Sequence, residues 1–156
     1  MNSYKIFLLF LIPIQGWGQG NFLRFLPSES GIIQTIDCKS ARLTFQIEEG
    51  FYIQADKVLN DNFIPTQLKL ELNLATDIQK ILYPKVEILL LGGIEEAPVF
   101  QGKIEVWIEF DSWSVIPVDQ IKGSLLYQAC NKQKCFFPRK LTFQLPPSNH
   151  PKLLMP

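Results

Sequence analysis

Two cysteines separated by four residues, Cys130 and Cys135, are the side chains of this chain best suited to chemistry. Residues 125–130 and 135–138 have the composition of two strands, and residues 131–134 that of a turn. A hairpin with such a loop places its flanking residues opposite each other, with Cβ atoms about 4.5–5.5 Å apart. A disulfide requires roughly 3.5–4.5 Å, so a small local adjustment would let the pair open and close. The spacing therefore predicts a redox switch.

Basic residues cluster near this pair in the sequence: Lys132, Lys134, Arg139 and Lys140. Positive charge favours the thiolate, which is the reactive form of cysteine. A hairpin nevertheless lacks the activation that a helix N-terminus gives to other redox cysteines. We therefore expect a less reactive thiol that responds mainly to a docked partner. The alternative interpretation of the basic residues is a solvated turn.

Other cysteine chemistries are disfavoured by the residues that are missing. A structural zinc site requires four ligands, whereas the single histidine, His150, lies in a proline-rich segment and Cys38 is far away in sequence. A cysteine nucleophile for hydrolysis needs an imidazole base, and the part expected to fold has none. The acidic pairs at 48–49 and 95–96 are typical of turns rather than of glycosidases. We predict no metal and no cofactor, whereas thiol–disulfide exchange needs only the pair, access for a partner and a route to thiolate.

The first 18 residues predict export. Lys5 precedes an apolar run over residues 6–14, and Gly16-Trp17-Gly18 follows as a small-x-small pattern that suits signal peptidase. The run is shorter than the roughly 20 residues that cross a bilayer; the alternative is a hydrophobic first strand. We expect a signal peptide over residues 1–18, a periplasmic product, and no membrane insertion of the mature domain.

Export changes how the cysteines are interpreted. Thiols pair in an oxidising compartment, and a total of three cysteines leaves one over. The close pair would shut a very short loop and remove little entropy from the unfolded chain, which weakens a purely structural role. Cys38 is then the remaining thiol, and we expect it to be buried and free.

The rest of the pattern predicts short strands. Alternating apolar and polar residues mark half-buried strands at 42–47, 67–74, 103–110, 125–129 and 141–145. Only residues 75–82 permit a short helical turn. Several short strands with turns between them predict an all-β sandwich over residues 19–145, followed by a proline-rich tail or linker at 146–156. The formal net charge of zero provides no field that would attract nucleic acid.

The segment 123–138, with its Tyr-Gln-x-Cys and Cys-x-x-Pro patterns, resembles the signature hairpin of the amino-terminal periplasmic domain of DsbD-type thiol:disulfide interchange proteins. Residues 43–54 are similar to that family's second motif, and Tyr83-Pro84-Lys85 to its middle region. The resemblance covers essentially the whole mature chain. It implies an immunoglobulin-like β-sandwich that carries its cysteine pair on a hairpin.

The resemblance also implies a function and residue roles. Such domains receive electrons from a thioredoxin-like domain and a membrane-embedded part, and pass them to periplasmic thioredoxin-fold proteins, which include disulfide isomerases and the reductants of cytochrome c maturation. Carried over by position, Cys135 forms the mixed disulfide with the partner and Cys130 resolves it. The side chains expected to line the site are Tyr52, Tyr127, Phe136 and Pro138.

The family shields its cysteines with a cap loop that bears an aromatic residue. The corresponding region here is 88–93, so the resemblance places a possible cap at Leu90, Leu91 and Gly92, aliphatic where an aromatic residue is usual. The pattern of the residues alone is equally typical of a buried strand followed by a Gly-Gly turn. Cys38 matches nothing in the family pattern.

These observations predict an exported thiol–disulfide relay, an oxidoreductase of the protein-disulfide reductase type. Family proteins continue into transmembrane helices and a thioredoxin-like domain, whereas this sequence ends at Pro156. The electron donor is therefore expected to be either a separate membrane protein or a fused part of a longer chain. The alternative function is a secreted β-sandwich binding module whose disulfide is a passive staple.

Overall fold

The structure is a computed structural model that describes residues 21–34, 39–72, 76–91, 94–111 and 121–145. The predicted signal peptide, the proline-rich tail, Cys38, Gly92 and His150 lie outside these residues. None of the helical segments that are described is long and apolar enough to cross a membrane. The elements are β1 (Leu23–Phe25), the 3-10 turn η1 (Pro27–Glu29), β2 (Gly31–Gln34), β3 (Lys39–Ile47), β4 (Tyr52–Gln54), β5 (Gln67–Glu71), β6 (Ile78–Leu82), β7 (Glu87–Leu91), β8 (Glu95–Gln101), β9 (Lys103–Phe110), β10 (Lys122–Tyr127), β11 (Ala129–Cys130) and β12 (Arg139–Gln144).

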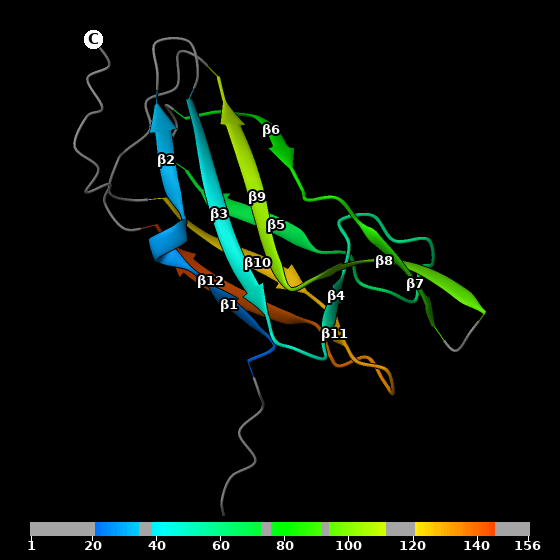
Figure 1. The fold of residues 1–156 in the computed structure, drawn as a ribbon. Helices are drawn as coiled ribbons and strands as arrows, with labels where there is room; N and C mark the ends of the chain where they lie inside the picture. The colour runs from blue at the N-terminus through cyan, green and yellow to red at the C-terminus, as the bar shows by residue number, and fades with distance from the viewer. Residues whose placement is uncertain (1–20, 35–38, 73–75, 92–93, 112–120, 146–156) are drawn as a thin grey trace, which may run out of the picture.

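These strands form three antiparallel sheets (Figure 1). The first has the order β1-β3-β9-β6, and β2 also pairs with β3. The second has the order β12-β10-β5, and the third the order β11-β4-β8-β7. The third sheet carries the first cysteine on β11, so the position of this sheet decides where the cysteine pair lies.

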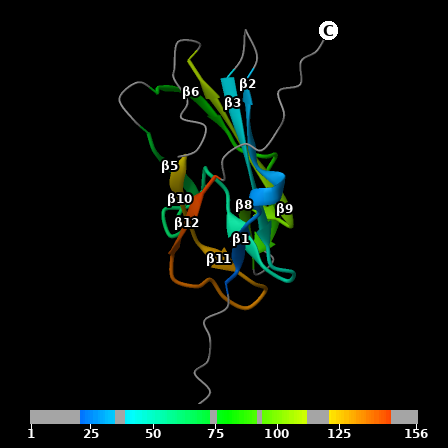
Figure 2. The ribbon, with the colours of Figure 1, turned by 90° about the vertical axis from the view of Figure 1, so that its left-hand side faces the viewer.

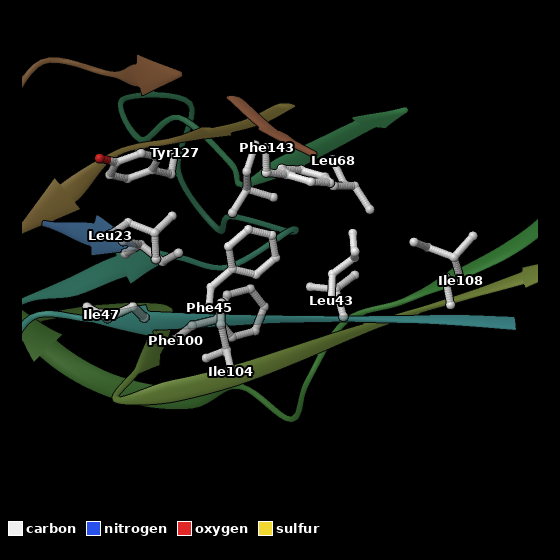
Figure 3. Packing of buried hydrophobic residues seen from close by; sticks show 14 of the residues in the cluster. Leu23, Leu43, Phe45, Ile47, Leu68, Phe100, Ile104, Ile108, Tyr127 and Phe143 are labelled. Atoms are coloured by element: carbon white, nitrogen blue, oxygen red, sulfur yellow. The ribbon is translucent and has the colours of Figure 1, made fainter. Parts of the chain in front are cut away.

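The first and second sheets are the two layers of a sandwich. Seen from the side, β5, β10 and β12 lie on one side and β2, β3 and β9 on the other (Figure 2). Leu43, Phe45 and Ile108 from the first layer meet Leu68 and Phe143 from the second (Figure 3). Each apolar side chain buried in this way contributes about 1.5–3 kcal/mol relative to an exposed one, which makes this interface the main source of stability.

Strand periodicity explains the burial pattern of β9 fully and that of β3 only in part. In β9, Ile104, Val106 and Ile108 are buried and alternate with half-exposed residues, as the sequence predicts. In β3 the outward-facing Thr44 is also buried, because Ser30 and η1 cover it. The Thr44 backbone N–H donates to Ser30 Oγ at 2.9 Å, and its hydroxyl donates to the Glu29 carbonyl at 2.8 Å.

The third sheet is joined to the sandwich through Gly102. This residue separates β8 from β9 and has φ of +64°, a conformation that glycine adopts without a steric cost. Its carbonyl accepts the backbone N–H of Ile47 at 2.8 Å, which holds the turn against the end of β3. The chain thereby passes from the sandwich layer into the sheet that contains β4 and β11.

The structure confirms an all-β, immunoglobulin-like sandwich with a cysteine-bearing hairpin. The expectation of a helical turn within residues 75–82 is wrong, because residues 78–82 form β6. Lys80, Ile81 and Leu82 pair with β9, and this long-range pairing overrides the weak local preference. The pairing is irregular between Ile78 and Lys80, which disturbs the period-two pattern there.

Replacement of Gly123 by alanine tests how closely the second layer is packed. An added Cβ would lie 2.7 Å from the Lys69 carbonyl oxygen, 2.7 Å from a Phe143 ring carbon and 2.9 Å from a Leu70 methyl. Because β10 is held between two paired strands, we expect Gly123→Ala to lower the free energy of unfolding by about 2 kcal/mol. Denaturant unfolding of the oxidised protein measures this.

Gly31→Ala is the matched control. Gly31 also lies in a strand, but an added Cβ there meets nothing within 4 Å. The control should be neutral or slightly stabilising, since alanine reduces the freedom of the unfolded chain. Equal unfolding midpoints for the two variants would contradict the close packing around Gly123.

Candidate functional site

The cysteine hairpin starts where β11 pairs with β4. Cys130 stands opposite Tyr52 in this pairing. The chain then turns, with the Asn131 backbone N–H donating to the Lys134 carbonyl at 2.9 Å. The Asn131 side-chain oxygen accepts the backbone N–H groups of Gln133 and Lys134, both at 2.9 Å. Asparagine favours such turns because its side chain can bond to the backbone ahead of it.

The turn brings the two cysteines together as the sequence predicts. Cys130 and Cys135 form an isolated antiparallel bridge, and a disulfide joins them with Cα atoms 4.0 Å apart. The Phe136 backbone N–H donates to the Ala129 carbonyl at 2.8 Å immediately beyond the bridge. The disulfide thus closes the mouth of a turn that backbone hydrogen bonds already define.

The two sulfurs lie in different surroundings. Cys130 is 0% exposed and belongs to a small cluster with Tyr52, Ala97 and Val99. Cys135 is exposed on the outer side of the turn. In the disulfide form, solvent therefore reaches Cys135 and not Cys130.

The three residues after Cys135 differ in their exposure. The Phe136 ring packs with its centroid 4.5 Å from that of Phe22 and 6.0 Å from that of Phe51. Phe137, by contrast, is 91% exposed, and Pro138 is exposed beside it. Phe136 anchors the hairpin to the fold, and Phe137 with Pro138 forms an apolar surface next to Cys135.

Side-chain amides connect the hairpin to its surroundings. The Gln128 side-chain oxygen accepts the Ile64 backbone N–H at 3.0 Å, and its nitrogen donates to the Phe136 carbonyl at 3.2 Å. The Gln54 side-chain nitrogen donates to Cys130 Sγ at 3.5 Å. One glutamine therefore fixes the backbone of the hairpin, and the other contacts a sulfur directly.

The two tyrosines expected at the site occupy different places. Tyr52 lies beside the pair, and its hydroxyl donates to the Asn131 carbonyl at 3.3 Å. Tyr127 belongs to the main core instead, opposite Arg139 in the β10–β12 pairing. Burial raises the pKa of both tyrosines, and for Tyr127 the charge of Arg139 partly offsets the rise.

The region of the possible cap is the edge strand β7. Leu91 and Leu89 pack against the cluster that contains Cys130, whereas Leu90 is 64% exposed and Ile88 53%. The alternative prediction of a buried strand is therefore right about the strand but wrong about its burial, because Ile88 and Leu90 on one face of β7 are exposed. Gly92 lies outside the described residues.

Two of the four basic side chains near the cysteines lie over aromatic rings. The Lys134 ammonium is 5.0 Å from the Phe136 ring centre, and the Arg139 guanidinium is 4.6 Å from that of Phe22. Lys132 and Lys140 are exposed. Within the described segments no three histidine, cysteine, aspartate or glutamate residues gather as metal ligands would. The site consists of a disulfide between one buried and one exposed cysteine.

Sequence analysis missed three residues of this site: Gln54, Gln128 and Phe137. Gln54 stands between two buried apolar residues, Ile53 and Ala55. A polar residue in an apolar stretch of strand is a signal that could have identified it. The exposure of Phe137 has no such signal, because its neighbour Phe136 is the same residue type.

Comparison with known proteins identifies a family. Residues 24–147 match the family model described as "Thiol:disulfide interchange protein DsbD, N-terminal". A comparison with curated proteins finds no match.

Several solved structures have a related fold. The chain is similar to the N-terminal periplasmic domain of ScsB from Proteus mirabilis, with 11% identity, a TM-score of 0.57, and coverage of 82% of this chain and 47% of that one. It is similar to the reduced N-terminal domain of DsbD from Neisseria meningitidis, with 18% identity, a TM-score of 0.48, and coverage of 75% and 82%. A third structure is the complex of the DsbD and PilB N-terminal domains from Neisseria meningitidis, with 17% identity, a TM-score of 0.48, and coverage of 79% and 87%.

Alkylation after mild reduction tests the difference between the two sulfurs. When the reduced, folded protein meets limiting iodoacetamide, we expect Cys135 to react at least about tenfold faster than Cys130, because reaction requires access to solvent. Peptide mass spectrometry measures the two rates. In denaturant the rates should become similar. Equal rates in the folded protein would mean that the hairpin opens when it is reduced.

Proposed function

This chain belongs to the family of N-terminal domains of the thiol:disulfide interchange protein DsbD, and on that premise we propose that it is an exported electron relay. Its reduced Cys130–Cys135 pair reduces a disulfide in a periplasmic thioredoxin-fold protein, either a disulfide isomerase or a reductant of cytochrome c maturation. A membrane or thioredoxin-like donor, separate or fused, returns the pair to the dithiol. The activity is that of a protein-disulfide reductase.

The observation that carries this proposal is the unequal exposure of the two cysteines. A sulfur that attacks a protein disulfide must be reached by another folded protein, and Cys135 is exposed. A resolving sulfur needs only to reach its neighbour, and Cys130 is buried directly opposite. Cys135 therefore forms the mixed disulfide, and Cys130 resolves it.

The exchange balances in two steps. The Cys135 thiolate attacks one partner sulfur, a bond between Cys135 and the partner forms, and the second partner sulfur leaves as a thiolate. The Cys130 thiolate then attacks Cys135 Sγ, the internal disulfide forms, and the first partner sulfur leaves with its electron pair. The partner gains two electrons and becomes a dithiol.

Export fits the same picture. We propose a cleaved signal peptide over residues 1–18, the relay domain over 19–145 and a tail or linker over 146–156; the family match over residues 24–147 supports a single domain in this part of the chain. An oxidising compartment allows a disulfide to persist between turnovers. We therefore place the mature domain in the periplasm.

Replacement of one cysteine at a time tests the relay. Cys130→Ser removes the resolving sulfur, so Cys135 should accumulate as a covalent adduct with a thioredoxin-fold protein in the native host. Non-reducing electrophoresis detects the adduct, and mass spectrometry identifies the partner. In a Cys38→Ser background, Cys135→Ser should give no adduct, since the remaining cysteine, Cys130, is buried.

The same pair of variants separates other outcomes. Adducts with Cys135→Ser in place of Cys130→Ser would reverse the two roles. The absence of adducts with both variants would contradict the relay and support a passive staple in a secreted binding module. A staple would also have a reduction potential below about −300 mV, whereas a relay lies nearer its partners.

Replacement of Phe137 tests the apolar surface beside Cys135. Phe137→Ser removes an exposed aromatic ring from the expected docking surface, so reduction of the trapped partner should slow by about tenfold. Oxidation of the dithiol by glutathione disulfide should stay unchanged, because a small molecule does not need this surface. Stopped-flow fluorescence measures both rates.

Ile33→Ser is the control for this variant. Ile33 is another exposed apolar residue, at 41%, and it lies on β2 in the sandwich layer rather than on the cysteine hairpin (Figure 1). Its replacement should leave the reaction with the partner unchanged. An equal loss of rate in both variants would show that exposed apolar surface in general, and not Phe137, is responsible.

A further inference from the structure

Gln54 is a polar side chain in a fully buried position. It ends β4 and is 0% exposed, as are its neighbours Ile53 and Ala55. Its backbone is fixed on both sides, because its N–H donates to the Gln128 carbonyl at 3.2 Å and its carbonyl accepts the Thr66 hydroxyl at 2.5 Å. The side chain therefore has little freedom to turn away from Cys130.

The two polar atoms of this side chain are used unequally. Nε2 donates to Cys130 Sγ at 3.5 Å, whereas Oε1 is buried and has no hydrogen-bond partner among the described residues. Burial of an unpaired carbonyl destabilises a fold, and an apolar side chain of similar size would avoid that cost. The presence of glutamine here calls for a reason other than stability.

The reason lies in what Cys130 needs when the disulfide opens. A buried thiol has one S–H to donate, and a buried thiolate needs donors because burial among apolar groups disfavours its charge. The amide Nε2–H, which already donates to Cys130 Sγ in the disulfide, can donate to the thiolate.

Other groups around Cys130 do not replace this donor. Tyr52 is the titratable residue of its cluster, and the Tyr52 hydroxyl donates to Asn131 instead. Lys132 and Lys134 of the turn are exposed. The other members of the cluster are apolar: Ala97 and Val99 of β8, and Leu89 and Leu91 of β7.

We infer that Gln54 stabilises the Cys130 thiolate through its Nε2–H and so promotes the step in which Cys130 displaces the partner. This inference rests on the proposed relay. In that step the Cys130–Cys135 bond forms, the bond between Cys135 and the partner sulfur breaks, and the electron pair leaves with the partner thiolate. The proton of the Cys130 thiol passes to water beforehand, because an amide is not a base.

A chromogenic disulfide isolates this step from any protein partner. The reduced chain, in a Cys38→Ser background, reacts with dithiobis(nitrobenzoate). Attack by Cys135 releases a first thionitrobenzoate, and closure of the ring by Cys130 releases a second. The rate constant of the second absorbance phase, measured across pH, gives a profile. The midpoint of this profile reports the ionisation of Cys130.

Gln54→Leu should move this midpoint upward by about one pH unit, since a hydrogen bond to a charged group is lost. Below the midpoint, closure should be roughly threefold slower, because about tenfold less thiolate is only partly offset by its greater nucleophilicity. Above the midpoint, closure should be roughly threefold faster for the same reason. A merely structural defect would change the rate alike at every pH.

Three further variants and measurements complete the test. Gln54→Met fills the space without an N–H donor and should shift the profile as Gln54→Leu does, which guards against a folding defect in one variant. Gln46→Leu makes the same exchange at a half-buried glutamine whose Nε2 donates to the Ile47 carbonyl at 2.9 Å, and it should leave the profile unchanged. The thermal midpoint of oxidised Gln54→Leu should be equal to or above that of the parent.

The outcomes distinguish this inference from the relay itself. Unshifted profiles in both Gln54 variants would overturn the role of Gln54 even if Cys130→Ser still traps a partner. Shifted profiles without any trapped partner would retain the hydrogen bond to the thiolate and overturn the relay. A shift in Gln46→Leu as large as in Gln54→Leu would also overturn the inference.

Discussion

The pairing of β11 with β4 is the constraint on which the site depends. It places Cys130 opposite Tyr52 and beneath the side chains of β7 and β8, where solvent does not reach. A turn of fixed geometry then returns the chain to the outer side, where Cys135 is exposed. The disulfide therefore links the buried Cys130 to the exposed Cys135. In the proposed relay, this one bond connects the interior of the domain with a partner protein docked at its surface.

The hairpin acts as part of the fold because Phe136 ties it there. Its ring packs on Phe22 and Phe51, and its carbonyl and backbone N–H are bonded to Gln128 and Ala129. The next residue, Phe137, lies outside the strands and is 91% exposed. The hairpin is therefore anchored by Phe136, while Phe137 stays at the surface beside Cys135.

The environment of Cys130 shows a balance between stability and reactivity. Apolar neighbours shield the sulfur but also disfavour its charged form. A buried amide offsets this with a hydrogen bond that does not bring a net charge into the core. The unpaired oxygen of Gln54 is a local cost in stability of the kind that functional sites often contain.

The sequence by itself determined the strands with clear alternation, the sandwich class and the disulfide, because these depend on local periodicity and on a spacing that a short turn converts directly into proximity. Only the tertiary structure decided which sulfur is buried, that Phe136 and not Phe137 enters the core, that Leu91 faces the pair while Leu90 faces away, and that residues 78–82 pair with β9 instead of forming a helical turn. These outcomes depend on which layer covers which face of each strand, and contacts between segments distant in the sequence set that covering. Gln54 illustrates both contributions. The sequence shows a polar residue in an apolar strand, but its contact with Cys130 forms only because β4 pairs with β11.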